Sequence, residues 1–231
     1  MENALSMSLY KYMEGAGVDW AVCGGHAIDL FIGRQTRDHQ DVDVAVFWDQ
    51  RERLLNYLLT GGFRIFEPEN GLLREVTGAE DNFRRNDNLW CIAGDSPAYK
   101  IERDHANFYR ITTRRRHQDT LDFIEFLFNR RNGDQFIYKR DKSITHESAI
   151  LRSGAGMPYL APELVLLYKS VFIRSAESRD PADIDRVSRC RHDFAAAAPL
   201  LDERRKCWLE HALRISYPNG HEWLDVLREH S

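Results

Sequence analysis

Apolar and polar positions follow two different periods along the chain, and their distribution predicts its elements. In the N-terminal part, residues at helical spacing are interleaved with short β-branched or alternating runs. We expect helices there over residues 4–14, 26–33 and 50–60, and strands over residues 20–23, 41–47, 63–66, 88–92, 121–128 and 135–138. The remainder of residues 67–107 is polar and rich in turn residues, and its pattern assigns no element.

The C-terminal part follows the helical period alone. Helices are expected over residues 163–173, 181–194, 199–213 and 222–229, with prolines at first-turn positions. The change from the mixed pattern of helices and strands to the purely helical pattern falls near residues 154–158. The sequence therefore predicts an α/β (α+β) fold, in which residues 1–155 form a mixed, antiparallel-rich sheet flanked by helices and residues 156–231 form a helical second domain.

Composition narrows the class of protein. The chain has 231 residues, of which 43% are hydrophobic and 29% charged, as in a globular protein with an ordinary core. Its net charge of −4 disfavours an obligate nucleic-acid binder, which normally carries a basic excess. The four cysteines are scattered, and no apolar run reaches the roughly 18 residues that a membrane span needs. We expect a cytoplasmic protein without a membrane partner.

Two carboxylates stand close together in the predicted strand 41–47. Asp41 and Asp43 are two positions apart, so their side chains project from the same face, while Val42 and Val44 point into the core. Adjacent carboxylates repel each other unless a cation lies between them. For ligands that are all oxygen, the favoured ion is Mg²⁺, which shares its remaining positions with water and phosphate.

A glycine pair precedes these carboxylates at the start of a predicted helix. Gly24 and Gly25 let the backbone approach a phosphate closely, and the N–H groups of the first helical turn attract the anion. Arg34, Arg37 and His39 follow on the loop between this helix and the strand. A phosphate cradle and a metal site thus lie close together in the sequence, as a nucleoside triphosphate requires.

These residues carry a resemblance to a known superfamily. The segments Gly24-Gly25-His26-Ala27-Ile28-Asp29 and Arg34-Gln35-Thr36-Arg37-Asp38-His39-Gln40-Asp41-Val42-Asp43 resemble the signature of the polymerase-β-type nucleotidyltransferases, most closely the lincosamide and aminoglycoside nucleotidyltransferases. The chain has His26 where those enzymes commonly carry tryptophan. A looser likeness runs from Tyr159 through Lys169.

The resemblance implies a fold, a reaction and a set of site residues. It implies a minimal nucleotidyltransferase domain in residues 1–155 that uses Mg²⁺ and an NTP, with ATP expected, and transfers the nucleoside monophosphate to a hydroxyl of a small molecule such as an aminoglycoside or lincosamide antibiotic. Pyrophosphate is the second product. The residues expected to bind the nucleotide are Gly24, Gly25, His26, Arg37, His39 and Lys169.

The same superfamily implies a third carboxylate on a neighbouring strand. Asp122 and Glu125 in the run 121–128 are the candidates, and they are three positions apart, so they cannot share a strand face. Glu125 has apolar neighbours on both sides, where a carboxylate is costly unless a metal compensates it. We favour Glu125 as metal ligand or general base, with Asp122 second.

Two other functions remain open from the sequence. A toxin-type nucleotidyltransferase would perform the same chemistry on tRNA or protein, and the arginine runs 114–116 and 130–131 keep this alternative open. A non-catalytic nucleotide-binding relative is the other. The intact pair Asp41 and Asp43 disfavours it, because a decayed site is expected to lose a metal ligand first.

Overall fold

The computed structural model describes residues 4–39, 41–78, 87–113, 121–173 and 180–229. Its contacts divide the chain into two compact units that are each discontinuous in sequence. The first contains Met1–Val22 and His39–Arg131, and the second contains Cys23–Asp38 and Asn132–Ser231. This division differs from the predicted single boundary at residue 155. The helix after the first strand belongs to the second unit, where it packs against helices of the C-terminal part of the chain.

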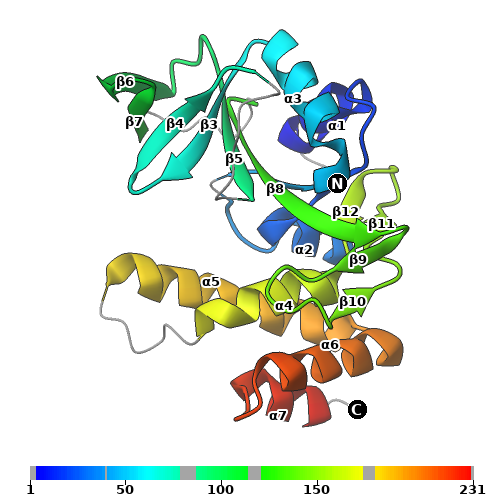
Figure 1. Ribbon diagram of the computed structural model, residues 1–231. Coiled ribbons are helices and arrows are strands. Elements are labelled where there is room, and N and C mark those ends of the chain that lie inside the picture. The colour runs from blue at the N-terminus through cyan, green and yellow to red at the C-terminus, as the bar shows by residue number, and fades with distance from the viewer. Residues whose placement is uncertain (1–3, 40, 79–86, 114–120, 174–179, 230–231) are drawn as a thin grey trace. The chain divides into compact units, whose positions relative to one another are not determined.

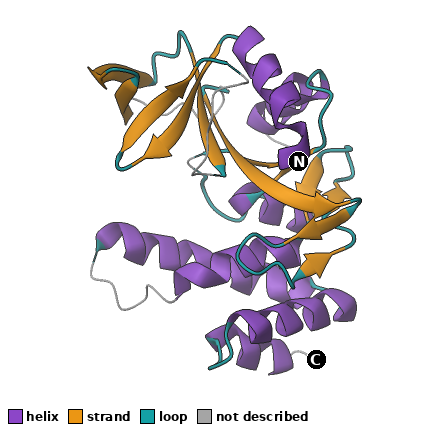
Figure 2. Cartoon of the chain, viewed as in Figure 1, coloured by secondary structure: helices purple, strands orange, loops and turns teal. Residues whose placement is uncertain are grey.

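The first unit is built on a mixed sheet (Figures 1 and 2). Within this unit, neighbouring strands follow the order β1-β2-β8-β5-β3-β4-β7-β6. The pair β2–β8 is parallel, and the other pairs in this order are antiparallel. The strands are β1 (Trp20–Val22), β2 (Asp43–Phe47), β3 (Phe63–Glu69), β4 (Leu72–Val76), β5 (Asn88–Ala93), β6 (Tyr99–His105), β7 (Phe108–Thr113) and β8 (Phe123–Asn132).

The middle strands of this sheet are buried and its far edge is exposed. Val44 on β2 and Phe126 on β8 are completely buried, as β-branched and aromatic residues in a sheet interior are expected to be. At the other end, β6 has the sequence YKIERDH, and most of its residues are exposed. The mixed, antiparallel-rich sheet is therefore confirmed, with a solvated hairpin β6–β7 at its edge.

Two helices pack with the sheet of the first unit. They are α1 (Ala4–Glu14) and α3 (Arg51–Thr60), and the 3₁₀ turn η1 (Trp48–Gln50) leads into α3. The apolar face of α3 buries Leu54, Leu55 and Leu58, which recur at helical spacing. Tyr57 of α3 donates a hydrogen bond to the backbone oxygen of Tyr12 at 2.5 Å, which joins the two helices.

The second unit is mainly helical. Its helices include α4, α5, α6 and α7, which Figure 1 colours from yellow to red, together with α2 from the early part of the chain. The elements of this unit are α2 (Gly24–Ile32), β9 (Gln135–Ile137), β10 (Thr145–His146), β11 (Ile150–Arg152), β12 (Pro158–Leu160), α4 (Pro162–Ile173), α5 (Pro181–Ala197), η3 (Ala198–Leu200), α6 (Glu203–Ser216) and α7 (Glu222–Glu229).

Helix α4 is the core of the second unit. It contacts α2, α5 and α6, and most of its side chains are buried, Leu164 and Leu167 completely. A helix that is apolar on every side is stable only when other elements surround it. On the outer helices, the rings of Phe194 and Trp223 stack with centroids 4.2 Å apart, which joins α5 to α7.

The predicted elements are found with small changes at their ends. The predicted helix 26–33 begins two residues earlier, at Gly24, and the predicted helix 199–213 is divided into η3 and α6 by Leu201 and Asp202. Asp202 caps α6 by accepting a hydrogen bond from the Arg205 amide at 2.9 Å. Within the part of the chain that the structure describes, no helix combines the length and apolar character needed to cross a membrane.

Candidate active site

Three carboxylates converge on one face of the sheet in the first unit. Asp41 lies two residues before the start of β2, Asp43 is the first residue of that strand, and Glu125 lies on β8. Asp43 and Glu125 are register partners in the parallel pair, and the Glu125 amide donates to the Val42 carbonyl at 3.0 Å. One oxygen from each carboxylate lies within 4.8 Å of the others. The sheet register thus places these side chains together.

The three carboxylates differ in burial, and burial changes the pKa of Glu125. Asp41 is exposed, whereas Asp43 and Glu125 are half-buried. Burial raises the pKa of Glu125 and the negative charge of Asp41 adds to the rise, while the hydrogen bond from Asn88 opposes it. The excess negative charge makes the group a strong site for a positive ion.

The residues fit a magnesium ion. The donors are all carboxylate oxygens, which are hard ligands of the type that Mg²⁺ prefers, and their spacing permits one ion to contact all three. Asp41, Asp43 and Glu125 would hold the ion. Because Asp41 is exposed, the ion would also be accessible to water and to a phosphate oxygen.

Asp122 lies outside this group. It precedes β8 and its backbone oxygen accepts a hydrogen bond from the Ala93 amide at 3.0 Å. Its position three residues before Glu125 turns it away from the face that Glu125 occupies. Of the two candidates for the third carboxylate, the geometry favours Glu125.

Asn88 is a site residue that the sequence did not reveal. Its side-chain Nδ2 donates a hydrogen bond to Glu125 Oε1 at 2.7 Å from the neighbouring strand β5. This bond fixes one carboxylate oxygen. The residue stands at the start of a predicted strand, but only the register between β5 and β8 shows that it meets Glu125.

The glycine pair belongs to the second unit. Gly24 and Gly25 form the start of α2, and Gly24 has a φ of 64°, a left-handed conformation that favours glycine. The side chain of Cys23 makes no capping hydrogen bond at this end. His26 follows in the first turn and is nearly buried. A glycine-rich helix start is therefore present where the sequence predicted a phosphate cradle.

The loop after α2 is held by side-chain hydrogen bonds within the second unit. Asp29 Oδ1 accepts from the Thr36 amide at 2.9 Å and from its hydroxyl at 2.6 Å. Asp29 therefore has a structural role, because it holds the loop after α2. The bonds fix the conformation of the chain just before Arg37.

Arg37 and Lys169 meet at a carboxylate that the sequence did not indicate. Arg37 Nε and Lys169 Nζ lie 2.8 and 2.7 Å from the carboxylate oxygens of Asp193 on α5, and Asp193 is completely buried. Burial raises the pKa of Asp193, but the hydrogen bond from Arg37 and the charge of Lys169 outweigh it and hold the pKa below its usual range. Arg37 and Lys169, two residues that the sequence predicted to bind the nucleotide, thus share one buried carboxylate. His39 belongs to the first unit.

The arginine run that the structure describes, residues 130–131, gives little support for a nucleic-acid surface. Arg131 donates to Asp19 and Asp49 at 2.8 Å each and lies over the Phe47 ring, so its charge is neutralised within the first unit. Arg130 lies over the ring of Trp48. The run 114–116 falls outside the described residues.

Part of the chain matches the model of a known protein family. The family model of the aminoglycoside-2''-adenylyltransferases matches residues 6–79, a segment that contains the glycine pair, Asp41 and Asp43. A crystal structure of ANT(2'')-Ia in complex with adenylyl-2''-tobramycin is 14% identical, with 92% of this chain and 98% of that chain covered and a TM-score of 0.52. No sequence among curated proteins matches the chain significantly.

Two further solved structures are similar at low identity. A solution structure of ANT(2'')-Ia is 15% identical over 98% of this chain and 96% of that chain, with a TM-score of 0.52. The lincomycin-bound lincosamide antibiotic adenylyltransferase LnuA is 12% identical over 83% of this chain and 97% of that chain, with a TM-score of 0.48. The ANT(2'')-Ia structures show that the chain has a nucleotidyltransferase fold.

The chain has the fold of the nucleotidyltransferases, and the segment that the family model matches contains the glycine pair and the two aspartates. Over residues 6–79, the family that it resembles is that of the antibiotic-modifying aminoglycoside-2''-adenylyltransferases.

Proposed function

We propose that this enzyme transfers AMP from ATP to a hydroxyl group of a small molecule, such as an aminoglycoside or lincosamide antibiotic, with Mg²⁺ as the cofactor. The observation that carries the proposal is the convergence of Asp41, Asp43 and Glu125 on one sheet face. The family match supports ATP as donor and an aminoglycoside as acceptor class. The lincosamide alternative rests on the sequence motif.

Each carboxylate has a role in this proposal. Asp41 and Asp43 hold the metal, and Glu125 completes the ligand set or accepts the proton of the acceptor hydroxyl. When bound, Mg²⁺ neutralises phosphate charge and makes the α-phosphorus more electrophilic. Asn88 keeps Glu125 oriented by donating a hydrogen bond to its Oε1.

The group transfer balances with the atoms that the two substrates supply. The acceptor oxygen attacks the α-phosphorus and loses its proton to Glu125, while the bond from the α-phosphorus to the bridging oxygen breaks and its electron pair leaves with pyrophosphate. The register of β2 and β8 places the Glu125 carboxylate beside Asp43 and Asp41, where it can accept the proton of a hydroxyl that attacks a metal-bound phosphate. Glu125 is thus suited to the base role.

The residues that we propose to bind the nucleotide are the ones that the sequence predicted. Gly24, Gly25 and His26 at the start of α2 offer backbone N–H groups to phosphate. Arg37, His39 and Lys169 supply positive charge. Arg37 and Lys169 carry two positive charges against the single charge of Asp193, so this group retains a net positive charge toward an anionic ligand.

The structure favours a small acceptor over a macromolecular one. Modification of tRNA would call for a basic surface, and Arg131 is committed to ion pairs with Asp19 and Asp49. A non-catalytic role is disfavoured because the complete group of three carboxylates is costly to keep without a cation.

The proposal is tested by measuring pyrophosphate released from ATP by the purified protein, with tobramycin or lincomycin as acceptor. Release that requires both Mg²⁺ and an acceptor, and that disappears in an Asp41→Ala/Asp43→Ala variant, supports the proposal. A folded wild-type protein that releases pyrophosphate with neither acceptor contradicts the acceptor class. ATP binding that is equally strong in EDTA contradicts the role of the metal.

A further inference from the structure

Strand β5 presents a second side-chain N–H group to the Glu125 carboxylate. Trp90 is the direct register partner of Glu125 in the antiparallel pair β5–β8, and Asn88 lies two residues before Trp90 on the same strand. Residues two apart on a strand project from the same face, so both side chains lie on the face that carries the carboxylate. Asn88 already donates a hydrogen bond to Glu125 Oε1 at 2.7 Å.

The indole N–H of Trp90 has no completed hydrogen bond. Its Nε1 atom is buried, and among the described residues no group accepts from it at ordinary length and angle. Buried polar atoms are nearly always hydrogen-bonded, and the indole N–H of a buried tryptophan normally finds an acceptor. The N–H group of Trp90 is therefore a donor that needs a partner.

Glu125 is the acceptor on which this N–H group acts. Side chains that face each other directly in an antiparallel pair have Cβ atoms about 4.5–5.5 Å apart, within reach of a tryptophan and a glutamate. Burial raises the pKa of the Glu125 carboxyl. The Trp90 N–H group opposes that rise, as the Asn88 amide does, because both stabilise the charged carboxylate.

Aromatic packing fixes the position of the indole. Trp90 meets Phe123 edge-on with ring centroids 5.6 Å apart, and Phe123 packs against Tyr99 of β6 with centroids 5.8 Å apart. On the other neighbouring strand, β3, the register partner of Trp90 is Phe66, which is completely buried. Because the ring is held by these contacts, the movement that completes the hydrogen bond falls to the Glu125 side chain.

We propose that Trp90 is a positioning residue for Glu125 and that its Nε1–H donates a hydrogen bond to the carboxylate, in addition to the bond from Asn88. Two donors from one strand then hold the carboxylate ionised and in one orientation beside Asp41 and Asp43. The effect on catalysis rests on the proposed function, whereas the hydrogen bond itself does not.

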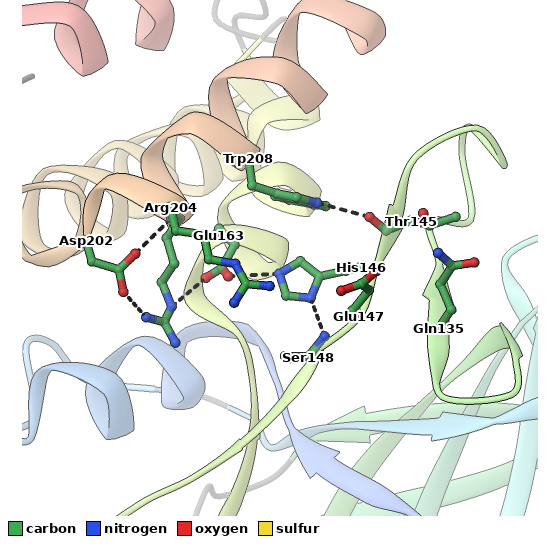
Figure 3. A pocket seen from close by; sticks show the side chains of 10 residues that line it. Gln135, Thr145, His146, Glu147, Ser148, Glu163, Asp202, Arg204 and Trp208 are labelled. Carbon is green, nitrogen blue, oxygen red and sulfur yellow. Dashed lines mark hydrogen bonds and ion pairs between the residues drawn. The ribbon is translucent and has the colours of Figure 1, made fainter.

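The hydrogen bond is tested by NMR of the indole N–H groups in the full chain labelled with ¹⁵N. The Trp90 resonance is identified by its nuclear Overhauser contacts with the Phe123 ring. Its proton resonance moves upfield in Glu125→Gln, because a charge-assisted hydrogen bond is lost. The reference is Trp208 of the second unit, whose Nε1 donates to the Thr145 oxygen at 3.0 Å and whose resonance stays in place (Figure 3). A Trp90 resonance that does not move in Glu125→Gln overturns the proposal.

The positioning role is tested with Trp90→Phe, which removes the N–H group and keeps an aromatic ring beside Phe123. With ATP, Mg²⁺ and a responsive acceptor, kcat falls about tenfold while both KM values stay the same, as expected when a group that orients a metal ligand is lost. Trp208→Phe is the matched control. It makes the same change at a hydrogen-bonded indole outside the active site and leaves kcat unchanged.

The two measurements separate this inference from the proposed function. A wild type without transferase activity contradicts the proposed function, and the Trp90 resonance still tests the hydrogen bond. An unchanged kcat in folded Trp90→Phe overturns the positioning role. A raised KM for ATP or for the acceptor, with kcat unchanged, contradicts the proposal as well, because the indole would then bind that substrate instead of Glu125.

Discussion

Asp43 and Glu125 are direct register partners on the parallel strands β2 and β8. They are 82 positions apart in sequence, yet the pairing places their carboxylates on one face beside Asp41. The arrangement is costly without a cation, because burial and the charge of Asp41 raise the pKa of Glu125. This relationship between two residues gives the first prediction.

Glu125→Gln is expected to lower turnover by roughly 10²–10³-fold, because a carboxylate that binds metal or accepts the proton contributes several kcal/mol. The matched control is Asp122→Asn, which removes a carboxylate from the residue just before the same strand. It leaves turnover nearly unchanged. Steady-state rates with ATP, Mg²⁺ and a responsive acceptor measure both. A larger loss in Asp122→Asn would assign the third carboxylate to Asp122.

Asn88→Ala is expected to lower turnover by about 10–100-fold, as loss of a group that orients a metal ligand commonly does. The hydrogen bond from Asn88 Nδ2 to Glu125 Oε1 is removed, and the carboxylate is free to rotate. Asn56→Ala, at an exposed position on α3, is the control. Equal rates for the two variants in a folded protein would show that Asn88 does not position Glu125.

Gly24→Ala is expected to weaken ATP binding and to destabilise the protein by about 1–2 kcal/mol, because Gly24 has a φ of 64° that an alanine adopts only with strain. Gly154→Ala is the control, since an added Cβ there meets no atom within 4 Å and its φ is not left-handed. Urea unfolding measures stability, and the KM for ATP measures binding. An unchanged KM would remove Gly24 from the nucleotide site.

Asp193→Asn is expected to destabilise the protein by about 3–5 kcal/mol at neutral pH, because Arg37 and Lys169 lose their buried counter-charge. Asp185→Asn on the same helix is the control. Its carboxylate is mostly exposed in an ion pair with Arg189, so its loss changes the free energy of unfolding by less than about 1 kcal/mol. Urea unfolding followed by circular dichroism gives both values.

The pH dependence of Asp193 follows from the direction of its shift. Its pKa is lower in the folded protein than in the unfolded chain, where it is about 3.9. The stabilisation is therefore complete above the unfolded pKa and is lost as pH falls toward the folded pKa. The unfolding free energies of the wild type and of Asp193→Asn should converge below about pH 4. A difference that stays constant with pH would contradict this assignment.

Much of the fold was predictable because its strongest signals are local. The β-branched run of β2 and the apolar face of α3 each reveal their element by period alone. β6 and β7 were not predicted. In β6 only Tyr99 and Ile101 are partly buried and the other five residues are exposed, so the strand carries little apolar signal in its sequence.

The site was predictable where its residues are neighbours in sequence. Asp41 and Asp43 are two positions apart, and the motif around them is compact. Asp193 was not predictable, because it lies 156 positions from Arg37 and reaches it only through the packing of α5. Asn88 likewise depends on strand register. Tertiary contacts between distant segments leave no period or spacing in the sequence.

The central claim is that Asp41, Asp43 and Glu125 form a magnesium site for a nucleoside triphosphate. Calorimetric titration of ATP into the wild type and into Asp43→Asn, each with Mg²⁺ and with EDTA, tests it most directly, with circular dichroism to confirm folding. The account predicts binding by the wild type that requires Mg²⁺ and is lost in Asp43→Asn. Binding that is equally tight in EDTA or in the variant would contradict it.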